Sequence, residues 1–159
     1  MNVDLFAEGM RMLASGVTIV TTEHETIKSG LTATAVCSLS ADPPRLLTCI
    51  NKLGQSYKMI SESRSFCVNI LAFDQVELAK CFAGLTDNTI EDRFTFGTWI
   101  KLKSGAPALK GALASFDCRV ETILDSGSHG IIIGDILDIS INKGSKPLLY
   151  MDGDFKTTI

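Results

Sequence analysis

The chain has 159 residues, of which 45% are hydrophobic and 21% charged, and its formal net charge is −3. This size and composition predict one globular domain over residues 1–159. Lysine and arginine are dispersed along the chain, so neither a nucleic-acid partner nor an anionic membrane is expected. The first ten residues lack the basic start of a signal peptide, and no uncharged apolar run reaches the ~18 residues of a membrane span. We therefore expect a cytoplasmic protein.

The five cysteines are too widely spaced for a CxxC redox pair or a zinc ribbon. We expect no metal site, and we expect the thiols to behave as small buried hydrophobic groups in a reducing compartment. They are Cys37, Cys49, Cys67, Cys81 and Cys118.

A first helix is predicted near the N-terminus, capped by Asn2 or Asp4 and ending near residues 15–16. Its apolar positions, Phe6, Met10 and Leu13, follow helical spacing. A strand is predicted over 17–22, followed by a polar turn.

Residues 31–40 alternate with a period of two and predict one continuous strand. One face would be apolar and the other would be rich in hydroxyl groups. Such a face can let a flat ligand lie close to the backbone, with Ser and Thr as donors and acceptors. The alternative is a surface strand whose hydroxyls face water. Two prolines, Pro43 and Pro44, are expected to end this strand because they cannot donate to a ladder.

The middle of the chain predicts strands over 46–51 and 65–71, each followed by a short helix. Ser56 would cap the first helix, which turns Met59 and Ile60 inward. A capping box of Asp74 and Glu77 would start the second, which closes at residues 83–84. Its apolar side would consist of Val76, Ala79 and Phe82.

The second half predicts mostly strands. Residues 86–105 are polar and irregular, with a helical turn over 90–94. Half-exposed alternation runs from Phe116 to Thr122, a more continuously apolar strand covers 129–141, and a short one covers 147–151. About seven strands without regular helix alternation predict a mainly β protein, an antiparallel β-barrel with peripheral helices.

Several ordered blocks of this sequence resemble those of one family over nearly the whole chain. They include GLTATAVCSLSADPP, LLTCINKLGQS, FCVNILAFDQVELAKCFAG, GAPALKGALASFDCRV and PLLYMDG. The chain is similar to the short-chain flavin reductases of two-component monooxygenase systems, which have a flavin-binding split-barrel fold. The TATAVCS and CIN segments resemble most the reductase component of 4-hydroxyphenylacetate 3-monooxygenase.

The resemblance implies a homodimer that binds FMN or FAD, reduces it with NADH or NADPH, and passes reduced flavin to a separate oxygenase. A non-catalytic flavin-binding split-barrel module is the alternative. The sequence has no GxGxxG fingerprint and no acidic residue placed to bind a ribose hydroxyl, so it does not distinguish NADH from NADPH. It does not distinguish FMN from FAD either, because an open groove could leave the adenylate half of FAD in solvent.

The resemblance also implies a set of flavin contacts. Thr32, Ala33, Thr34 and Ala35 would lie beneath the flavin ring, although many relatives carry Asn and Ser at the last two positions. Ser38 and Ser40 would serve the ribityl phosphate, and Ser56 would open a helix whose N–H groups suit a phosphate. The remaining implied contacts are Cys49, Ile50, Asn51, Phe82, Ala83 and Gly84.

His129 is the predicted catalytic residue. Its segment, Gly127-Ser128-His129, matches a family motif whose histidine lies near the nicotinamide, which implies nicotinamide positioning or proton delivery. The alternative is a packed or solvated histidine. Arg93 is a candidate phosphate or pyridine-nucleotide contact, or an ordinary surface arginine paired with Asp92 or Glu91.

Overall fold

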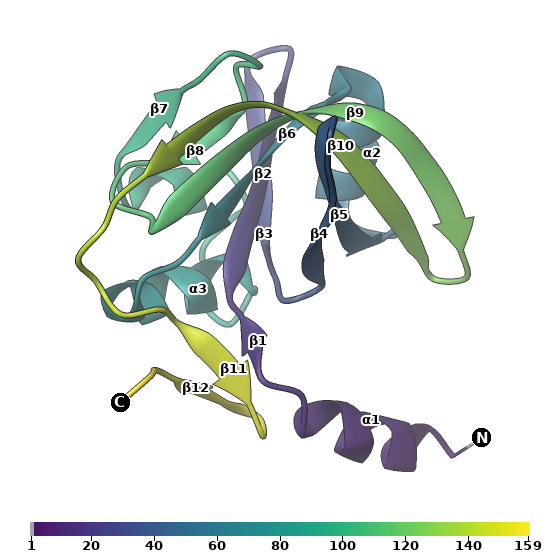
Figure 1. Ribbon diagram of the computed structural model, residues 1–159, viewed down its shortest axis with the longest axis vertical. Coiled ribbons are helices and arrows are strands. Elements are labelled where there is room, and N and C mark those ends of the chain that lie inside the picture. The colour runs from purple at the N-terminus through teal and green to yellow at the C-terminus, as the bar shows by residue number, and fades with distance from the viewer. Residues whose placement is uncertain (1) are drawn as a thin grey trace.

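The computed structural model describes residues 2–159, and its main feature is a seven-stranded antiparallel sheet (Figure 1). The strand order is β3-β2-β6-β9-β10-β5-β4, and β3 also contacts β5, so the sheet curls into a split barrel. The predicted mainly β, antiparallel split barrel with peripheral helices is confirmed. The strands are β2 (Thr18–His24), β3 (Ile27–Ala33), β4 (Val36–Ala41), β5 (Pro44–Asn51), β6 (Ser65–Ile70), β9 (Ala114–Ser126) and β10 (His129–Ile141).

The two edge strands of this sheet, β3 and β4, are consecutive in the chain. Only Thr34 and Ala35 separate them, and Cys49 of β5 donates its N–H to the Ala35 carbonyl at 3.0 Å. The predicted continuous strand over 31–40 is therefore wrong. Its predicted apolar face is wrong as well, because Leu39 is 48% exposed whereas Val36 packs against the core. Pro44 does not end the pairing, since it begins β5 opposite Ala41.

The barrel interior is a cluster of apolar side chains from almost every strand of the sheet. Helix α2 (Gln55–Ser63) packs over it through Ile60 and Tyr57. Gly130 is required at this point, because a Cβ there would lie 2.3 Å from Cε2 of Tyr57. Each fully buried apolar side chain contributes about 1.5–3 kcal/mol. The buried members are Val20, Ala33, Leu46, Ile50, Ile60, Phe66, Val68, Cys118, Val120 and Ile132.

A second cluster lies where η1 (Phe73–Gln75) and α3 (Val76–Phe82) pack against β2 and β3. Ala79 and Phe82 are buried and Val76 packs beside them, as predicted. The predicted capping box is wrong, because the Gln75 side chain accepts the Ala72 N–H at 2.9 Å. The excursion over 86–105 contains η2 (Asp92–Thr95) and β7 (Trp99–Lys101), and β7 pairs with β8 (Pro107–Leu109).

The two ends of the chain form an arm below the barrel (Figure 1). β1 (Ser15–Gly16), β11 (Leu149–Met151) and β12 (Asp154–Lys156) make a three-stranded sheet. Helix α1 (Val3–Arg11) is capped by Asn2, which accepts the Asp4 N–H at 2.8 Å. This helix ends before the predicted boundary at 15–16, and none of its residues is buried.

The second half of the sheet fits its prediction with one correction. β10 has the predicted bounds, 129–141. On β9, however, Asp117 is fully buried instead of half-exposed, because residues 104–106 cover it and its carboxylate accepts the Ser104 N–H at 2.7 Å. Within residues 2–159 no helix has the length and apolar character needed to cross a membrane.

Candidate flavin site

Four of the predicted flavin residues line one hollow, here called the β3 hollow. Thr32 and Ala33 end β3, Thr34 follows them, and Ala83 follows the last turn of α3; the volume of the hollow is about 270 Å³. β3 is the edge of the sheet and has no strand partner on its outer side within the described chain. An open strand edge offers backbone N–H and C=O groups to a ligand. The Thr32 hydroxyl is not free, since it donates to the Ala79 carbonyl at 2.6 Å.

A second hollow adjoins the first at Thr34, which lines both. This β4 hollow, of about 410 Å³, also contains Ala35, Cys37 and Cys49. The β3 and β4 hollows thus meet at Thr34, in the two-residue link Thr34-Ala35 between β3 and β4, here called the crossover.

Cys37 is exposed and Cys49 half-buried, which corrects the expectation that the thiols are buried; the other three cysteines are buried. Burial raises the pKa of the Cys118 thiol, and the nearby Asp117 carboxylate raises it further.

His129 and Asn51 lie on the outer face of the barrel, two residue pairs beyond Cys49. Residues i and i+2 of a strand share a face, so Asn51 points to the same side as Cys49, and His129 is its cross-strand partner on β10. This spacing corresponds to about 7 Å along the strand. The His129 ring is exposed, with Nδ1 2.8 Å from the Ser128 hydroxyl oxygen. It lines neither the β3 nor the β4 hollow.

Three predicted contacts have side chains that point into the interior. Ile50 and Phe82 are each 1% exposed and belong to the two core clusters. The Ser56 hydroxyl is buried against the Ser29 hydroxyl, 2.8 Å away. The prediction that Ser56 caps α2 is wrong, because Gly54 holds the N-cap position. Only the backbone of these three residues remains for a ligand.

The predicted phosphate contacts are split between two ends of the sheet. Ser40 lies opposite Arg45 near the start of β5, whereas Asn51 and the first turn of α2 lie at its end. Six residues of extended strand separate Arg45 from Asn51, about 20 Å. One phosphate group cannot contact both. The nearby lysines have partners as well: Lys52 pairs with Asp125 at 2.5 Å.

Arg93 is placed against the FAG segment, residues 82–84. Its Nη1 donates to the Phe82 carbonyl at 3.4 Å, and its Nε is buried without a hydrogen-bond partner among residues 2–159. The Gly84 backbone has a φ of +75°, a conformation that favours glycine. Arg93 forms no ion pair with a carboxylate of the described chain, so the interpretation as a paired surface arginine is wrong.

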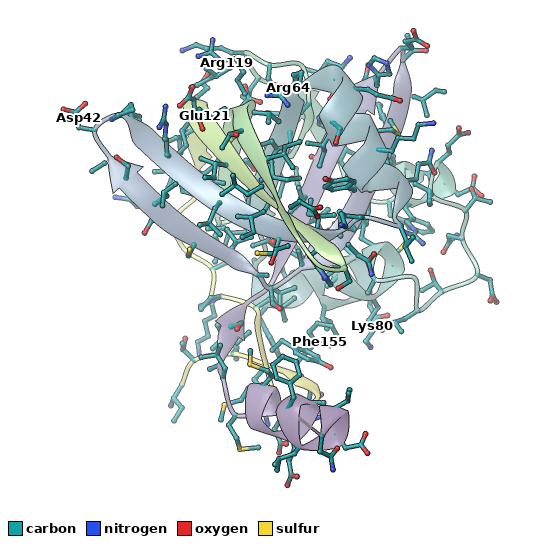
Figure 2. The ribbon with its side chains drawn as sticks, turned by 90° about the vertical axis from the view of Figure 1, so that its right-hand side faces the viewer. Asp42, Arg64, Lys80, Arg119, Glu121 and Phe155 are labelled. Atoms are coloured by element: carbon teal, nitrogen blue, oxygen red, sulfur yellow. The ribbon has the colours of Figure 1, made fainter. Side chains whose placement is uncertain are left out.

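The charge cluster of the barrel lies away from these hollows. Arg45 donates to Asp135 at 2.7 Å, and Arg119 contacts the other carboxylate oxygen at 3.2 Å. The hydrogen bond from Arg45 lowers the pKa of Asp135, and Arg119 lowers it further. Figure 2 shows Arg119 and Glu121 at the opposite end of the molecule from Phe155, which lines the β3 hollow.

The C-terminal hairpin contributes residues that sequence reasoning missed. Tyr150, Gly153 and Phe155 line the β3 hollow together with Leu85. The Asp152-Gly153 turn between short apolar runs is a hairpin signal that was available in the sequence. Nothing local, however, indicates that this hairpin approaches β3.

The residues 10–158 match the model of the flavin reductase-like domain family. The chain belongs to this family. It is 39% identical over 151 residues to the FMN reductase (NADH) RutF of Agrobacterium fabrum, covering 95% of this chain and 86% of that protein.

Solved structures of the family superpose on nearly the whole chain. The flavin reductase PheA2 has a TM-score of 0.92 at 33% identity, covering 100% of this chain and 99% of its own. BorF, the flavin reductase component of a bacterial two-component tryptophan halogenase, has a TM-score of 0.89 at 30% identity and covers 98% of both chains. These likenesses extend over the barrel and the arm together.

The donor groups of this flavin reductase-like chain fit a flavin. The β3 hollow joins an open strand edge to small side chains, Ala33 and Ala83, so that a flat ring can approach the backbone. The residues available to hold the ring are those of the crossover, Thr34 and Ala35, with Ala83. For the phosphate, the first-turn N–H groups of α2 remain, because no side chain caps that helix.

Proposed function

We propose that this protein oxidises NADH or NADPH with FMN or FAD and releases the reduced flavin. The observation that carries the proposal is the convergence of Thr32, Ala33, Thr34 and Ala83 on one hollow beside the open edge of β3. FMN and NADH are the favoured pair, because a relative at 39% identity is named FMN reductase (NADH).

Hydride transfer from a nicotinamide to a flavin depends more on how the protein positions the two rings than on acid-base catalysis by its side chains. A bound flavin supplies the hydride acceptor. The chain's own work is to hold the two rings in contact and to exclude water. The small side chains of Ala33 and Ala83 permit close approach, and we assign His129, on the outer face beyond Cys49, to orienting the nicotinamide or delivering a proton.

The partner that we propose is a separate oxygenase reached by diffusible reduced flavin. The similarity to BorF, a component of a two-component halogenase, supports such a division of labour. An aromatic hydroxylase such as 4-hydroxyphenylacetate 3-monooxygenase is the finer form of this proposal, based on the TATAVCS and CIN segments.

We further propose a cytoplasmic homodimer. α1 stands apart from the barrel in Figures 1 and 2, and Leu5, Phe6 and Met10 on it are 62%, 60% and 50% exposed. A helix with exposed apolar side chains gains by packing on a second copy. Light scattering coupled to gel filtration measures the mass, and a monomer at micromolar concentration would contradict the dimer.

The experiment that tests the activity mixes purified protein with each flavin and each nicotinamide nucleotide, and follows absorbance at the nicotinamide band. We expect flavin-dependent oxidation, fastest with FMN and NADH. Absence of oxidation in all four combinations rules out the enzyme. A yellow protein that keeps its flavin through gel filtration and ignores both nucleotides would instead be a non-catalytic flavin-binding module.

A further inference from the structure

The C-terminal hairpin β11–β12 forms one wall of the β3 hollow. Tyr150 of β11 and Phe155 of β12 face the hollow that Thr32, Thr34 and Ala83 line from the other side. Figure 1 shows this hairpin below the barrel, beneath β1. Two parts of the chain that are distant in sequence therefore enclose the same space.

The hairpin is anchored from several directions. Tyr150 pairs with Ser15 of β1 on one side and with Phe155 on the other. The Asp152 N–H donates to the Arg11 carbonyl at 2.8 Å, and the Thr157 hydroxyl donates to the Pro147 carbonyl at 2.9 Å. A wall held in this way can present an aromatic side chain without losing much conformational entropy on binding.

The two aromatic rings have different environments. Phe155 packs against the second core cluster, and its ring centroid lies 5.3 Å from that of Tyr150 at an interplanar angle of 66°. Tyr150 is 38% exposed, and its hydroxyl has no hydrogen-bond partner within residues 2–159. Phe155 thus supports Tyr150 from behind, and Tyr150 offers both ring surface and a free hydroxyl to a ligand.

The charges of the hairpin indicate which part of a flavin fits here. Asp152 lines a third hollow, which shares Thr34 and Tyr150 with the β3 hollow, and Asp154 lies two residues away, its carboxylate accepting the Phe155 N–H at 2.8 Å. Neither forms an ion pair within the described chain, and Arg11 lines the same third hollow as Asp152, where it is the one cationic residue. Two carboxylates disfavour a phosphate at this end, whereas the uncharged ring system is compatible with it.

We propose that Tyr150 contacts the isoalloxazine ring of the flavin and, supported by Phe155, holds it against the crossover residues. This inference rests on the proposed function, since it names a further ring contact of the same site. It also sets the direction of the ligand: the ring lies at the hairpin, and the phosphate extends away from Asp152 and Asp154.

The test uses three flavins that differ only outside the ring: FMN, riboflavin, which lacks the phosphate, and lumiflavin, which lacks the ribityl chain as well. Binding is measured by quenching of flavin fluorescence in the absence of any nicotinamide nucleotide. Tyr150→Leu should weaken all three by a similar factor, about 10-fold, as expected for loss of one aromatic stacking contact. Tyr150→Phe should stay within about 3-fold of the unmodified protein.

Phe73→Ala is the matched control, because Phe73 is also exposed, at 44%, and lines neither the β3 hollow nor the one next to Thr34. Circular dichroism confirms that each variant is folded, and the conservative Leu and Phe variants keep the strand pairing intact. Unchanged lumiflavin affinity in folded Tyr150→Leu overturns the inference, as does a loss confined to FMN. A protein that binds lumiflavin through Tyr150 yet oxidises no nicotinamide nucleotide would overturn the proposed function alone.

Discussion

The strands on either side of the crossover, β3 and β4, are both edge strands of the sheet, but their hydroxyl groups have different surroundings. Both strands carry hydroxyl side chains, but those of β3 are bonded inside the protein: Thr32 to the Ala79 carbonyl, and Ser29 to Ser56. Ser38, on β4, is exposed. The difference arises because α2 and α3 both pack against β3. What a strand packs against, and not its own pattern, decides whether its hydroxyls stabilise the fold or remain for a ligand.

The largest difference between β3 and β4 is expected at Phe82, whose ring packs against Gly30 of β3. Phe82→Ala should lower the free energy of unfolding by about 3–5 kcal/mol, because the ring is 1% exposed and packs on Phe94 and Trp99 at 5.1 and 5.4 Å. Urea denaturation followed by circular dichroism measures the change. Leu39→Ala on β4, at a side chain 48% exposed, should cost about 0.5 kcal/mol or less. Equal costs would show that the two strands are equally buried in solution.

The next effect concerns the exposed outer face of the barrel, where His129 lies opposite Asn51. His129→Ala should reduce kcat/KM for NADH about 10-fold to 100-fold, the effect of losing one positioned polar contact of about 1–3 kcal/mol. Stability and flavin affinity should remain, because the ring is exposed and its Nδ1 contacts only the neighbouring Ser128. The control is His24→Ala, because His24 ends β2 and its Nε2 lies 4.0 Å from Oε2 of Glu62 on α2. A collapse of flavin binding would place His129 on the flavin side of the site.

A smaller effect separates the hydroxyls of the two strands. Thr32→Ala removes the hydrogen bond to the Ala79 carbonyl and should cost about 1 kcal/mol of unfolding free energy. Ser38→Ala, where the side chain is exposed, should change it by about 0.5 kcal/mol at most. The same denaturation experiment resolves both. A larger loss from Ser38 than from Thr32 would reverse the comparison.

The smallest effect lies at the far end of β5, where Arg45 is paired with Ser40 of β4 and donates to Asp135. The Arg45 hydrogen bond lowers the pKa of Asp135 in the folded state, so its contribution to stability is present above the ordinary carboxyl pKa and is lost as pH falls through the lowered one. Asp135→Asn should therefore flatten the decrease of stability below about pH 4. Denaturation midpoints across that range test it, with Asp154→Asn as control. Parallel profiles for Asp135→Asn and the unmodified protein would contradict it.

The local sequence pattern was sufficient to predict elements whose residues have the same pattern whichever strand or helix they pack against. The continuous apolar run over 129–141 predicted β10 with its bounds, and the inward side of α3 followed from helical spacing. It failed at Thr34 and Ala35, because a period of two is the same whether a strand continues or leaves one partner for another. It failed at Ser56 for a similar reason, since the Ser29 hydroxyl that it contacts is supplied by a different strand.

The candidate site shows the same distinction between residues that the sequence predicts and residues that only the folded structure brings together. Thr32, Ala33, Thr34 and Ala83 were predicted together and share the β3 hollow, whereas Tyr150 was missed because only the folded arm brings it there. Ile50 and Phe82 were predicted as contacts from their blocks, and their side chains belong to the interior. Sequence therefore indicated the segments that line the hollow, and packing decided which side chains within them are accessible.

The two-residue link between β3 and β4 also limits how this chain can change in length. Inserting or deleting one residue at Thr34 or Ala35 would reverse which side chains of β4 face outward, because consecutive residues of a strand point to opposite faces. The turn at Glu25 and Thr26, by contrast, joins two strands that already pair with each other. Length variation among relatives should accumulate at that turn and be rare at the crossover.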